Sequence, residues 1–410
     1  MSSILWLEKE AIERGIHFHH ALRGHGGERI VEDGFVDGFH FESNTVFEFY
    51  GCHWHGCPKC YPNDRDMIVN NNNETRDDCL ARTKNKAERM RNAGYTVVEK
   101  WQCDAGNLEG VMPKKKTKVY PHAIFFDIET YGDKSFYEKR TEMFTIENAQ
   151  TAVSVSLADT LNPTPTHICD KNPKKWSKGF FEELRKRGQE IRDEVKKEFL
   201  PSDSEYLPKK RRSQINKWIN QVPVLGFNSG NFDLNVMNEL LVEKVYETTD
   251  KPVVCKNGKK IMFIKTDKFR FLDVMNYTGP GVSYDKWVKA YGCESTKSWM
   301  PYDWFDCPEK LDFPGLPEYS NWFSKLKGDY VLTLDEFRQC QRLFQENGMK
   351  TFTDWLEYYN NLDVFLALEA LVKMREFYEQ RKLDVFKDAV SRSDERRVGK
   401  ECRSRWSPYH

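Results

Sequence analysis

The chain has 410 residues, and its 63 lysine and arginine residues balance 63 aspartate and glutamate residues. This length favours two or three domains, and a hydrophobic content of 39% excludes a wholly disordered chain. No apolar run reaches the ~20 residues of a membrane-spanning helix, and the N-terminus lacks the pattern of a signal peptide. The cysteines are therefore expected in a reducing compartment, where closely spaced Cys and His residues indicate metal ligands before disulfides.

Residues 1–110 are predicted to form a small α/β domain. Apolar spacing and turn residues predict, in chain order, a helix over 4–14, strands over 29–41 and 44–51 joined by a turn at 42–44, a helix over 78–94 and a strand over 95–101. Asp37 then lies at the end of one strand and Glu48 within the next.

Two carboxylates on neighbouring strands can hold a divalent cation against a phosphodiester, where the cation polarises the phosphoryl oxygen and lowers the pKa of a bound water. His55 follows the second strand and would serve as general acid or base. The alternative is that Asp37 and Glu48 are surface charges at strand ends.

The cysteines of this domain predict a zinc site. Cys52, Cys57 and Cys60 lie within nine residues, in "CHWHGCPKC", and Cys103 follows the third strand. Three thiolates from one loop and one from a distant strand are typical of a closed, tetrahedral structural zinc site. Cys79 stands alone in a helix and is expected in the core.

The segments "VDGF", "TVFEFYGCHWHGC" and "KWQC" resemble the very-short-patch-repair endonucleases, a branch of the restriction-endonuclease-like fold, over residues 5–105. The resemblance implies that Asp37 binds metal, that His55 is the catalytic histidine, and that Cys52 and Cys103 bind zinc. The wider fold often has Glu-x-Lys where this chain has Glu48 and Tyr50, and a tyrosine supplies no cationic amine. Whether this domain cleaves DNA or retains only its zinc and fold is therefore left open.

A basic, proline-bounded run predicts a linker over 111–119, and a second domain is predicted over 120–391. Within that domain, the densely charged stretch 171–220 has helical spacing and predicts a solvated helical insertion. Residues 392–410 have no hydrophobic period and resemble a translated sequencing adapter, so they are predicted to be foreign to the protein.

Acidic residues mark three places in the second domain. An apolar strand over 122–133 carries Asp127 and Glu129 on one face, which is costly for a buried strand unless a cation neutralises them. The alternative is an ordinary exposed strand end. Asp233 begins a helix after the strand that starts at 222, and Tyr359 and Asp363 share one face of a helix over 355–374.

Together the four carboxylates, Asp127, Glu129, Asp233 and Asp363, predict a site for two Mg²⁺ or Mn²⁺ ions ~3.5–4 Å apart that hydrolyses a phosphodiester. Tyr359 is expected to orient the attacking water. The loop before Asp233 is expected to hold and stack a terminal nucleotide through Asn228, Asn231 and Phe232.

The segments "DIET", "NSGNFD" and "YNNLD" resemble the three exonuclease motifs of family B DNA polymerases, and residues 269–305 resemble the protein-primed branch found in Maverick/Polinton elements and related organellar and viral polymerases. The resemblance implies a ribonuclease H-like 3′–5′ exonuclease that proofreads during DNA replication. It also implies that this chain is the N-terminal part of such a polymerase, without the palm. Lys286 corresponds to a lysine that supports catalysis in that branch; the alternative is a surface lysine.

The alternative function is an inactive nucleic-acid-binding remnant of a transposable element or integrated virus. The expected partners are the 3′ end of a single DNA strand and a terminal priming protein, with no membrane. The expected location is intracellular, and the lysine-rich runs 113–118 and 208–212 are compatible with nuclear import.

Overall fold

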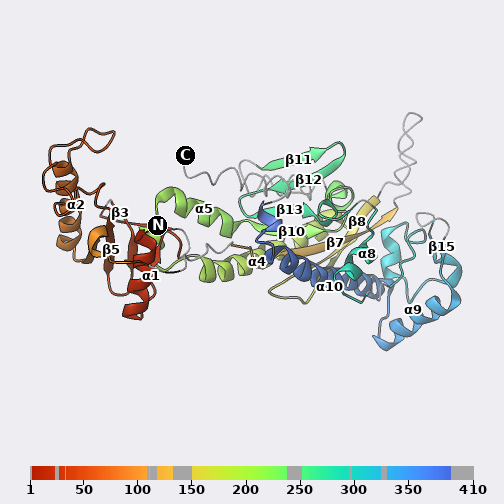
Figure 1. Ribbon diagram of the computed structural model, residues 1–410. Helices are drawn as coiled ribbons and strands as arrows, with labels where there is room; N and C mark the ends of the chain where they lie inside the picture. Colours follow the sequence, from red (N-terminus) through yellow and green to blue (C-terminus); the bar gives the residue numbers. More distant parts are fainter. Residues whose placement is uncertain are drawn as a thin grey trace. The chain divides into compact units, whose positions relative to one another are not determined.

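The computed structural model describes residues 2–23, 27–32, 34–108, 110, 118–132, 150–237, 252–279, 281–294, 298–324 and 330–388. Two compact units divide the chain (Figure 1): Met1–Lys116 with Lys196–Trp218, and Thr117–Val195 with Ile219–His410. The sequence-based limits instead place 196–218 in the second domain. The predicted linker lies mostly, and the predicted foreign tail wholly, outside the described residues. No helix in the described ranges is long and apolar enough to cross a membrane.

The first unit contains a four-stranded sheet in the order β1-β4-β5-β6, in which β5 pairs antiparallel with β4 and parallel with β6. Before residue 117, the described residues of this unit form α1 (Ser2–Arg14), β1 (His19–His20), β2 (Arg29–Val31), β3 (Gly34–Val36), β4 (Gly38–His40), β5 (Thr45–Tyr50), α2 (Arg76–Asn92), β6 (Thr96–Trp101) and η1 (Gln102–Asp104). The prediction of one strand over 29–41 is wrong. Glu32 has a φ of 46°, which turns the chain between β2 and β3, and Asp37 separates β3 from β4.

Strand β5 is buried along its whole length because both of its faces are covered. Phe47 belongs to a core cluster with residues of α1 and stacks on Phe18 at 4.2 Å between ring centroids. Val46, on the opposite face, belongs to a cluster with Met90 of α2. Side chains alternate along a strand, so Glu48 shares the face of Val46 and is directed toward α2.

Residues 196–218 are attached to the first unit by a buried ion pair. Arg29 donates to both carboxylate oxygens of Asp203, at 2.6 and 2.9 Å, and neither side chain is exposed. His19 Nδ1 lies 2.8 Å from the same carboxylate, and Tyr206 packs its ring against Phe39. This segment contains the end of α4 (Pro173–Phe199), η2 (Ser204–Tyr206) and most of α5 (Lys209–Asn220).

Because of this ion pair, we expect the first unit to lose stability in acid. Burial raises the pKa of Asp203, but the hydrogen bonds from His19 and Arg29 outweigh burial and hold it at about 2, below its ordinary 3.8. Because the folded pKa is depressed, the stabilisation is complete above about pH 5 and is lost as the pH falls through 2. A difference of about two pKa units corresponds to roughly 2.5 kcal/mol.

In Asp203→Asn, the free energy of unfolding of the first unit at neutral pH is expected to fall by about 3 kcal/mol, because Arg29 stays buried without its anion. Its dependence on pH between 4 and 2 should also weaken, as measured by denaturant titration at a series of pH values. Glu205→Gln, at an exposed position two residues away, is the control. Equal stability of the two variants would contradict the role given to the pair.

The second unit contains a seven-stranded sheet in the order β11-β12-β13-β10-β7-β8-β9. Strands β7, β8 and β9 are antiparallel, whereas β10 pairs parallel with β7 and β13 pairs parallel with β10. The strands are β7 (Ile124–Gly132), β8 (Gln150–Asp159), β9 (Thr166–Cys169), β10 (Val222–Gly226), β11 (Val253–Asn257), β12 (Lys260–Lys265) and β13 (Phe269–Asp273). The predicted α/β fold class is confirmed, and three antiparallel strands followed by two parallel ones fit a ribonuclease H-like sheet.

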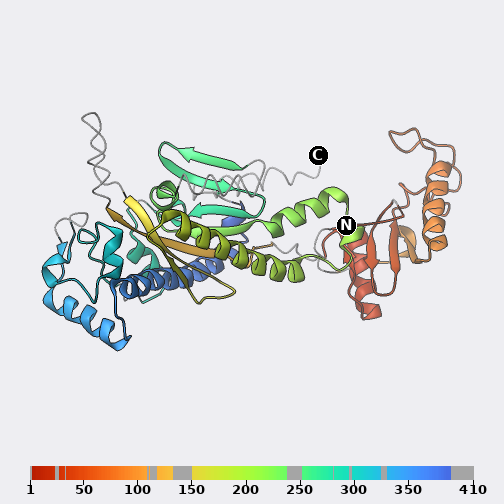
Figure 2. The same cartoon turned by 180° about the vertical axis from the view of Figure 1, so that it is seen from behind.

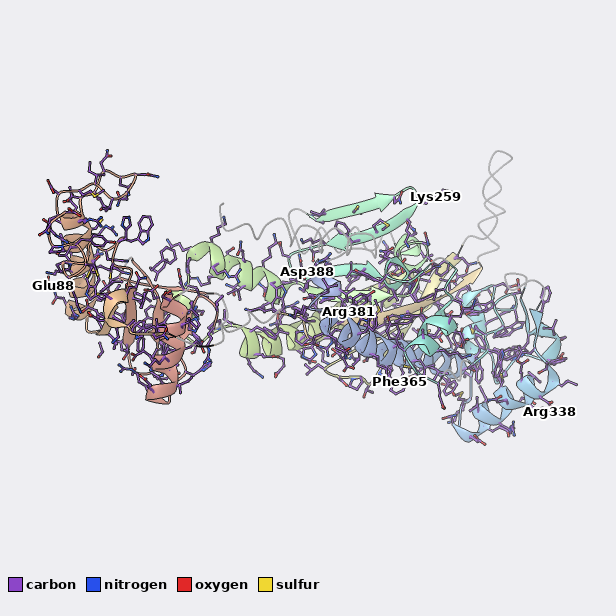
Figure 3. The ribbon with its side chains drawn as sticks, viewed as in Figure 1. Glu88, Lys259, Arg338, Phe365, Arg381 and Asp388 are labelled. Atoms are coloured by element: carbon purple, nitrogen blue, oxygen red, sulfur yellow. The ribbon has the colours of Figure 1, made fainter. Side chains whose placement is uncertain are left out.

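Helices α4 and α10 (Phe352–Glu379) cover opposite faces of this sheet (Figures 1 and 2). Phe126 of β7 packs its ring against Phe180 of α4, while the neighbouring Asp127 accepts a hydrogen bond from Asn360 of α10. On the outer side of α10, Phe365 (labelled in Figure 3) is 49% exposed. The face of β7 that carries Asp127 is therefore the face covered by α10.

The remaining elements of the second unit connect the sheet to α10 or extend from it. Among the described residues they are α6 (Asp233–Val236), η3 (Val274–Asn276), α8 (Tyr284–Ala290), η4 (Pro308–Asp312), η5 (Tyr319–Asn321), β14 (Phe323–Ser324), β15 (Tyr330–Val331), α9 (Leu334–Glu346) and α11 (Val385–Asp388).

Candidate functional site

Three carboxylates meet where α10 crosses β7. Asp127, Glu129 and Asp363 each have an oxygen within 4.8 Å of the others. Glu129 and Asp363 are 5% and 6% exposed, and Asp127 is half-buried. Carboxylates this close and this buried repel one another unless a cation lies between them, and carboxylate oxygens are the ligands that Mg²⁺ and Mn²⁺ prefer. These residues therefore fit a divalent metal ion.

Asp233, the fourth predicted acid, lies beside β7 but outside this group of three. It is buried at the start of α6, and the backbone N–H of Ile128 donates to its Oδ1 at 3.4 Å. Burial, with a smaller contribution from the charge of Asp273, raises the pKa of Asp233 to about 7. The hydrogen bond from Ile128 places its carboxyl group against the strand segment that carries Asp127 and Glu129.

Three polar residues that the sequence analysis did not select complete this region. Asn360 Nδ2 donates to Oδ2 and to the backbone oxygen of Asp127, at 3.0 and 3.3 Å. The hydroxyl of Tyr302 lies 2.9 Å from that of Tyr359, and the hydroxyl of Tyr284 donates to the backbone oxygen of Asp363. Helical spacing could have predicted the place of Asn360, because it lies three residues before Asp363 and so shares its face of α10. Tyr302 and Tyr284 lie far from α10 in the sequence, so their position near the acids could not be predicted from spacing.

The predicted nucleotide-binding residues lie on the loop between β10 and α6. Asn228 has a φ of 60°, and its side-chain oxygen accepts from Nδ2 of Asn231 at 2.8 Å. Its backbone oxygen accepts from the N–H groups of Asn231 and Phe232. Phe232 is 37% exposed, so its ring is accessible for stacking. The loop is thus fixed by its own hydrogen bonds and presents an aromatic ring next to Asp233.

Lys286 lies on the exposed side of α8, where its backbone N–H donates to the capping residue Ser283. Among the described residues, the side chain of Lys286 makes no hydrogen bond or ion pair with the acids. Its role in catalysis remains a prediction.

Comparison with known proteins gives no family assignment. No protein-family model matches the chain, and no curated protein matches it. Among solved structures, it is similar to the family B DNA polymerase from the hyperthermophilic archaeon Pyrobaculum calidifontis, with a TM-score of 0.24 and 16% sequence identity, over 70% of this chain and 32% of that chain. The chain spans about a third of the length of that polymerase. A TM-score of this size establishes neither a fold family nor a function.

The four predicted zinc ligands of the first unit come together. The sulfurs of Cys52, Cys57, Cys60 and Cys103 all lie within 4.8 Å of one another, and those of Cys57 and Cys103 are 3.8 Å apart. Bonds of 2.3 Å to a tetrahedral zinc ion would separate the sulfurs by about 3.8 Å. The thiolate donor set and its spacing therefore fit zinc.

The loop that carries these cysteines depends on Gly56. Its φ is 63°, and a Cβ atom at this position would lie 2.0 Å from the backbone oxygen of Arg76. The close approach of the loop to the start of α2 therefore requires glycine.

The carboxylates predicted on the sheet of the first unit face a lysine from α2. Lys86 Nζ lies 2.7 and 2.8 Å from the two carboxylate oxygens of Glu48, which is 3% exposed. Asp37 accepts a hydrogen bond from the backbone N–H of Phe49 at 2.8 Å. Burial raises the pKa of Glu48 to about 7; Lys86 opposes the shift, and the charge of Asp37 adds to it. The fold that this segment resembles often has a lysine at the position of Tyr50, whereas in this structure the amine comes from Lys86 of α2.

Within the described residues, His55 makes no hydrogen bond or ion pair with Asp37 or Glu48. Its Nδ1 lies 2.9 Å from the Thr83 hydroxyl on α2, and its ring packs against Tyr50. Burial, followed by the charges of Arg82 and Lys86, lowers the pKa of His55 to about 4, so the imidazole is neutral at physiological pH. A neutral imidazole can accept a proton but cannot donate one as an imidazolium acid.

Proposed function

We propose that the second unit is a metal-dependent 3′–5′ exonuclease acting on single-stranded DNA, as part of a family B DNA polymerase of the protein-primed type. The observation that carries this proposal is the convergence of Asp127, Glu129 and Asp363 within 4.8 Å at the junction of β7 and α10. A divalent metal at these residues would polarise the scissile phosphate and lower the pKa of the attacking water.

Seven residues of the site have separate tasks in the proposed hydrolysis. The three carboxylates would hold the metal, and Asn360 would fix the orientation of Asp127 through its hydrogen bond. Phe232 would stack on the terminal base, and Asn228 and Asn231 would keep the loop that presents it in place. The water oxygen bonds to phosphorus, the bond from phosphorus to the 3′ oxygen breaks, and that oxygen takes a proton. The products are a 5′-mononucleotide and a strand that is shorter by one residue.

The proposal is tested by comparing three single-stranded substrates of one sequence: a linear strand, a linear strand with 3′-terminal phosphorothioates, and a covalently closed circle. With Mg²⁺ or Mn²⁺, the linear strand should be shortened stepwise from its 3′ end. The phosphorothioate strand should be degraded much more slowly, and the circle should stay intact. Shortening from the 5′ end, or no product from the linear strand, would reject the proposal.

A second function is supported by the contact between Lys86 and Glu48. An amine beside two carboxylates can stabilise the negative charge that develops on a phosphodiester during cleavage. We infer that Asp37, Glu48 and Lys86 form an endonuclease centre in the first unit, on a fold that zinc at the four cysteines would stabilise. The alternative is a buried ion pair that serves stability alone.

Supercoiled plasmid separates these two functions because it has no 3′ end. In a chain that carries Asp363→Ala, nicking in Mn²⁺ is expected to fall on the order of 100-fold in Lys86→Met, since the unbranched side chain remains but the charge is lost. Lys84→Met, at an exposed position on the same helix, should nick at the parent rate. If the plasmid stays intact with every metal tested, the endonuclease proposal is rejected and the Lys86–Glu48 pair serves stability alone.

A further inference from the structure

Helix α5 presents a surface whose charges are all positive. Its sequence, "KKRRSQINKWIN", contains five lysine or arginine residues and no acidic residue. Lys209, Lys210 and Lys217 are exposed, and Arg211 and Arg212 are half-buried. Among the described residues, the side chains of the three lysines make no hydrogen bond or ion pair. Their charge is therefore available to a partner.

The packing of α5 holds these charges in a fixed arrangement. Ile215 is buried, which anchors one side of the helix. Trp218 packs its ring against Phe199 at 5.1 Å between centroids, next to the basic last turn of α4. Lys210 and Lys217 are seven residues apart, so they share one face of the helix and lie about 10 Å apart along its axis. The lysines therefore form a preformed array of cations.

Such an array is unfavourable without a partner of opposite charge. Neighbouring like charges on a helix repel one another, and α5 has no carboxylate to offset them. A solvated surface usually mixes both signs, as α4 does over Pro173–Phe199. The matching ligand is a polyanion with regularly spaced charges. Duplex DNA has one negative charge per about 1.7 Å of its axis, twice the density of a single strand.

We propose that α5 binds the phosphate backbone of double-stranded DNA through Lys209, Lys210 and Lys217, without reading the base sequence. Contacts of lysine with phosphate release counterions and position a protein on the duplex, but they carry no sequence information. The choice of DNA as the nucleic acid rests on the proposed function. The surface itself belongs to the first unit, in the segment that Asp203 attaches to Arg29.

The test measures the Kd of the full chain for a blunt duplex by fluorescence anisotropy at a series of salt concentrations. Mg²⁺ and Mn²⁺ are left out so that the DNA is not hydrolysed. In Lys209→Gln/Lys210→Gln/Lys217→Gln, Kd at about 0.1 M salt should rise on the order of 100-fold, and the slope of log Kd against log salt concentration should fall by about 3, one for each lost phosphate contact. Arginine at the same three positions should keep Kd within about twofold of wild type, because the contacts require charge.

Lys174→Gln/Lys175→Gln/Lys178→Gln is the matched control, since it removes the same charge from three exposed lysines at the start of α4. It should keep the wild-type Kd and slope. An unchanged Kd in the glutamine variant of α5, or an equal loss in both glutamine variants, would overturn the inference. So would wild-type affinity for the duplex combined with a loss of nuclear accumulation in cells, which would assign the run 208–212 to nuclear import.

A single strand of the same sequence tests the choice of the duplex. Its affinity should change little in the glutamine variant of α5, and a loss as large as that for the duplex would overturn this choice. Shortening of the linear strand with Mg²⁺ is measured separately. A chain that binds the duplex as expected but shortens no strand would reject the exonuclease and leave the binding surface on α5 supported.

Discussion

Replacing Asp363 by alanine is expected to lower exonuclease turnover on the order of 10³-fold, because the metal loses one of three close carboxylate ligands. The same change should not destabilise the metal-free protein, since it relieves repulsion among Asp127, Glu129 and Asp363. Wild type should gain thermal stability on addition of Mn²⁺, whereas the variant should gain little. Turnover and thermal unfolding with and without Mn²⁺ measure both effects.

Glu376→Ala is the control for this prediction, because Glu376 is exposed on the same helix and lies away from the acids in sequence. It should keep wild-type turnover and the wild-type response to Mn²⁺. Undiminished turnover in Asp363→Ala would show that the three carboxylates are not the catalytic centre. A fall in stability without metal would show instead that Asp363 is structural.

Removing zinc is expected to unfold the first unit while the second stays folded. Structural zinc contributes roughly 10–16 kcal/mol in small zinc domains, which exceeds the stability of a typical unit of this size. Cys57→Ser should lose the metal and the near-ultraviolet signal of Trp6 and its neighbours, which pack in the core of that unit. Exonuclease turnover should persist, since its acids lie in the second unit.

Cys79→Ala is the control for zinc loss, because Cys79 is buried in α2 but does not belong to the group of four sulfurs. It should retain one zinc per chain, measured by elemental analysis after gel filtration, at a modest cost in stability. A folded wild type that contains no zinc would contradict the assignment of all four ligands.

Local periodicity in the sequence is sufficient to predict most residues of the acidic site. Asp127 and Glu129 are two apart on a strand, and Tyr359 and Asp363 are four apart on a helix, so periodicity alone predicts that each pair shares one face. The structure shows in addition that the acids of β7 and α10, Asp127, Glu129 and Asp363, come together. Tyr302 could not be found in this way, because its contact with Tyr359 depends on how a distant loop packs under α10.

Tertiary packing also explains what sequence spacing missed in the first unit. Tyr50 stands where the resembled fold often has a lysine, and it supplies no amine. Lys86 nevertheless reaches Glu48, because α2 packs on the face of β5 that carries Val46 and Glu48. Similarly, the pairing of Arg29 with Asp203 joins residues 174 positions apart and helps to hold the segment 196–218 in the first unit. The charge composition of this segment indicates a solvated helix, but it does not indicate that Asp203 pairs with Arg29.

The most direct test of the central claim is the release of the 3′-terminal nucleotide from a strand that carries its label on that nucleotide. Wild-type chain with Mg²⁺ should release the label as a 5′-mononucleotide, and a chain with Asp127→Asn and Glu129→Gln should release almost none. These two substitutions keep the shape of the site and remove its charge. Equal release by both proteins, or release of the label within an oligonucleotide, would contradict the account.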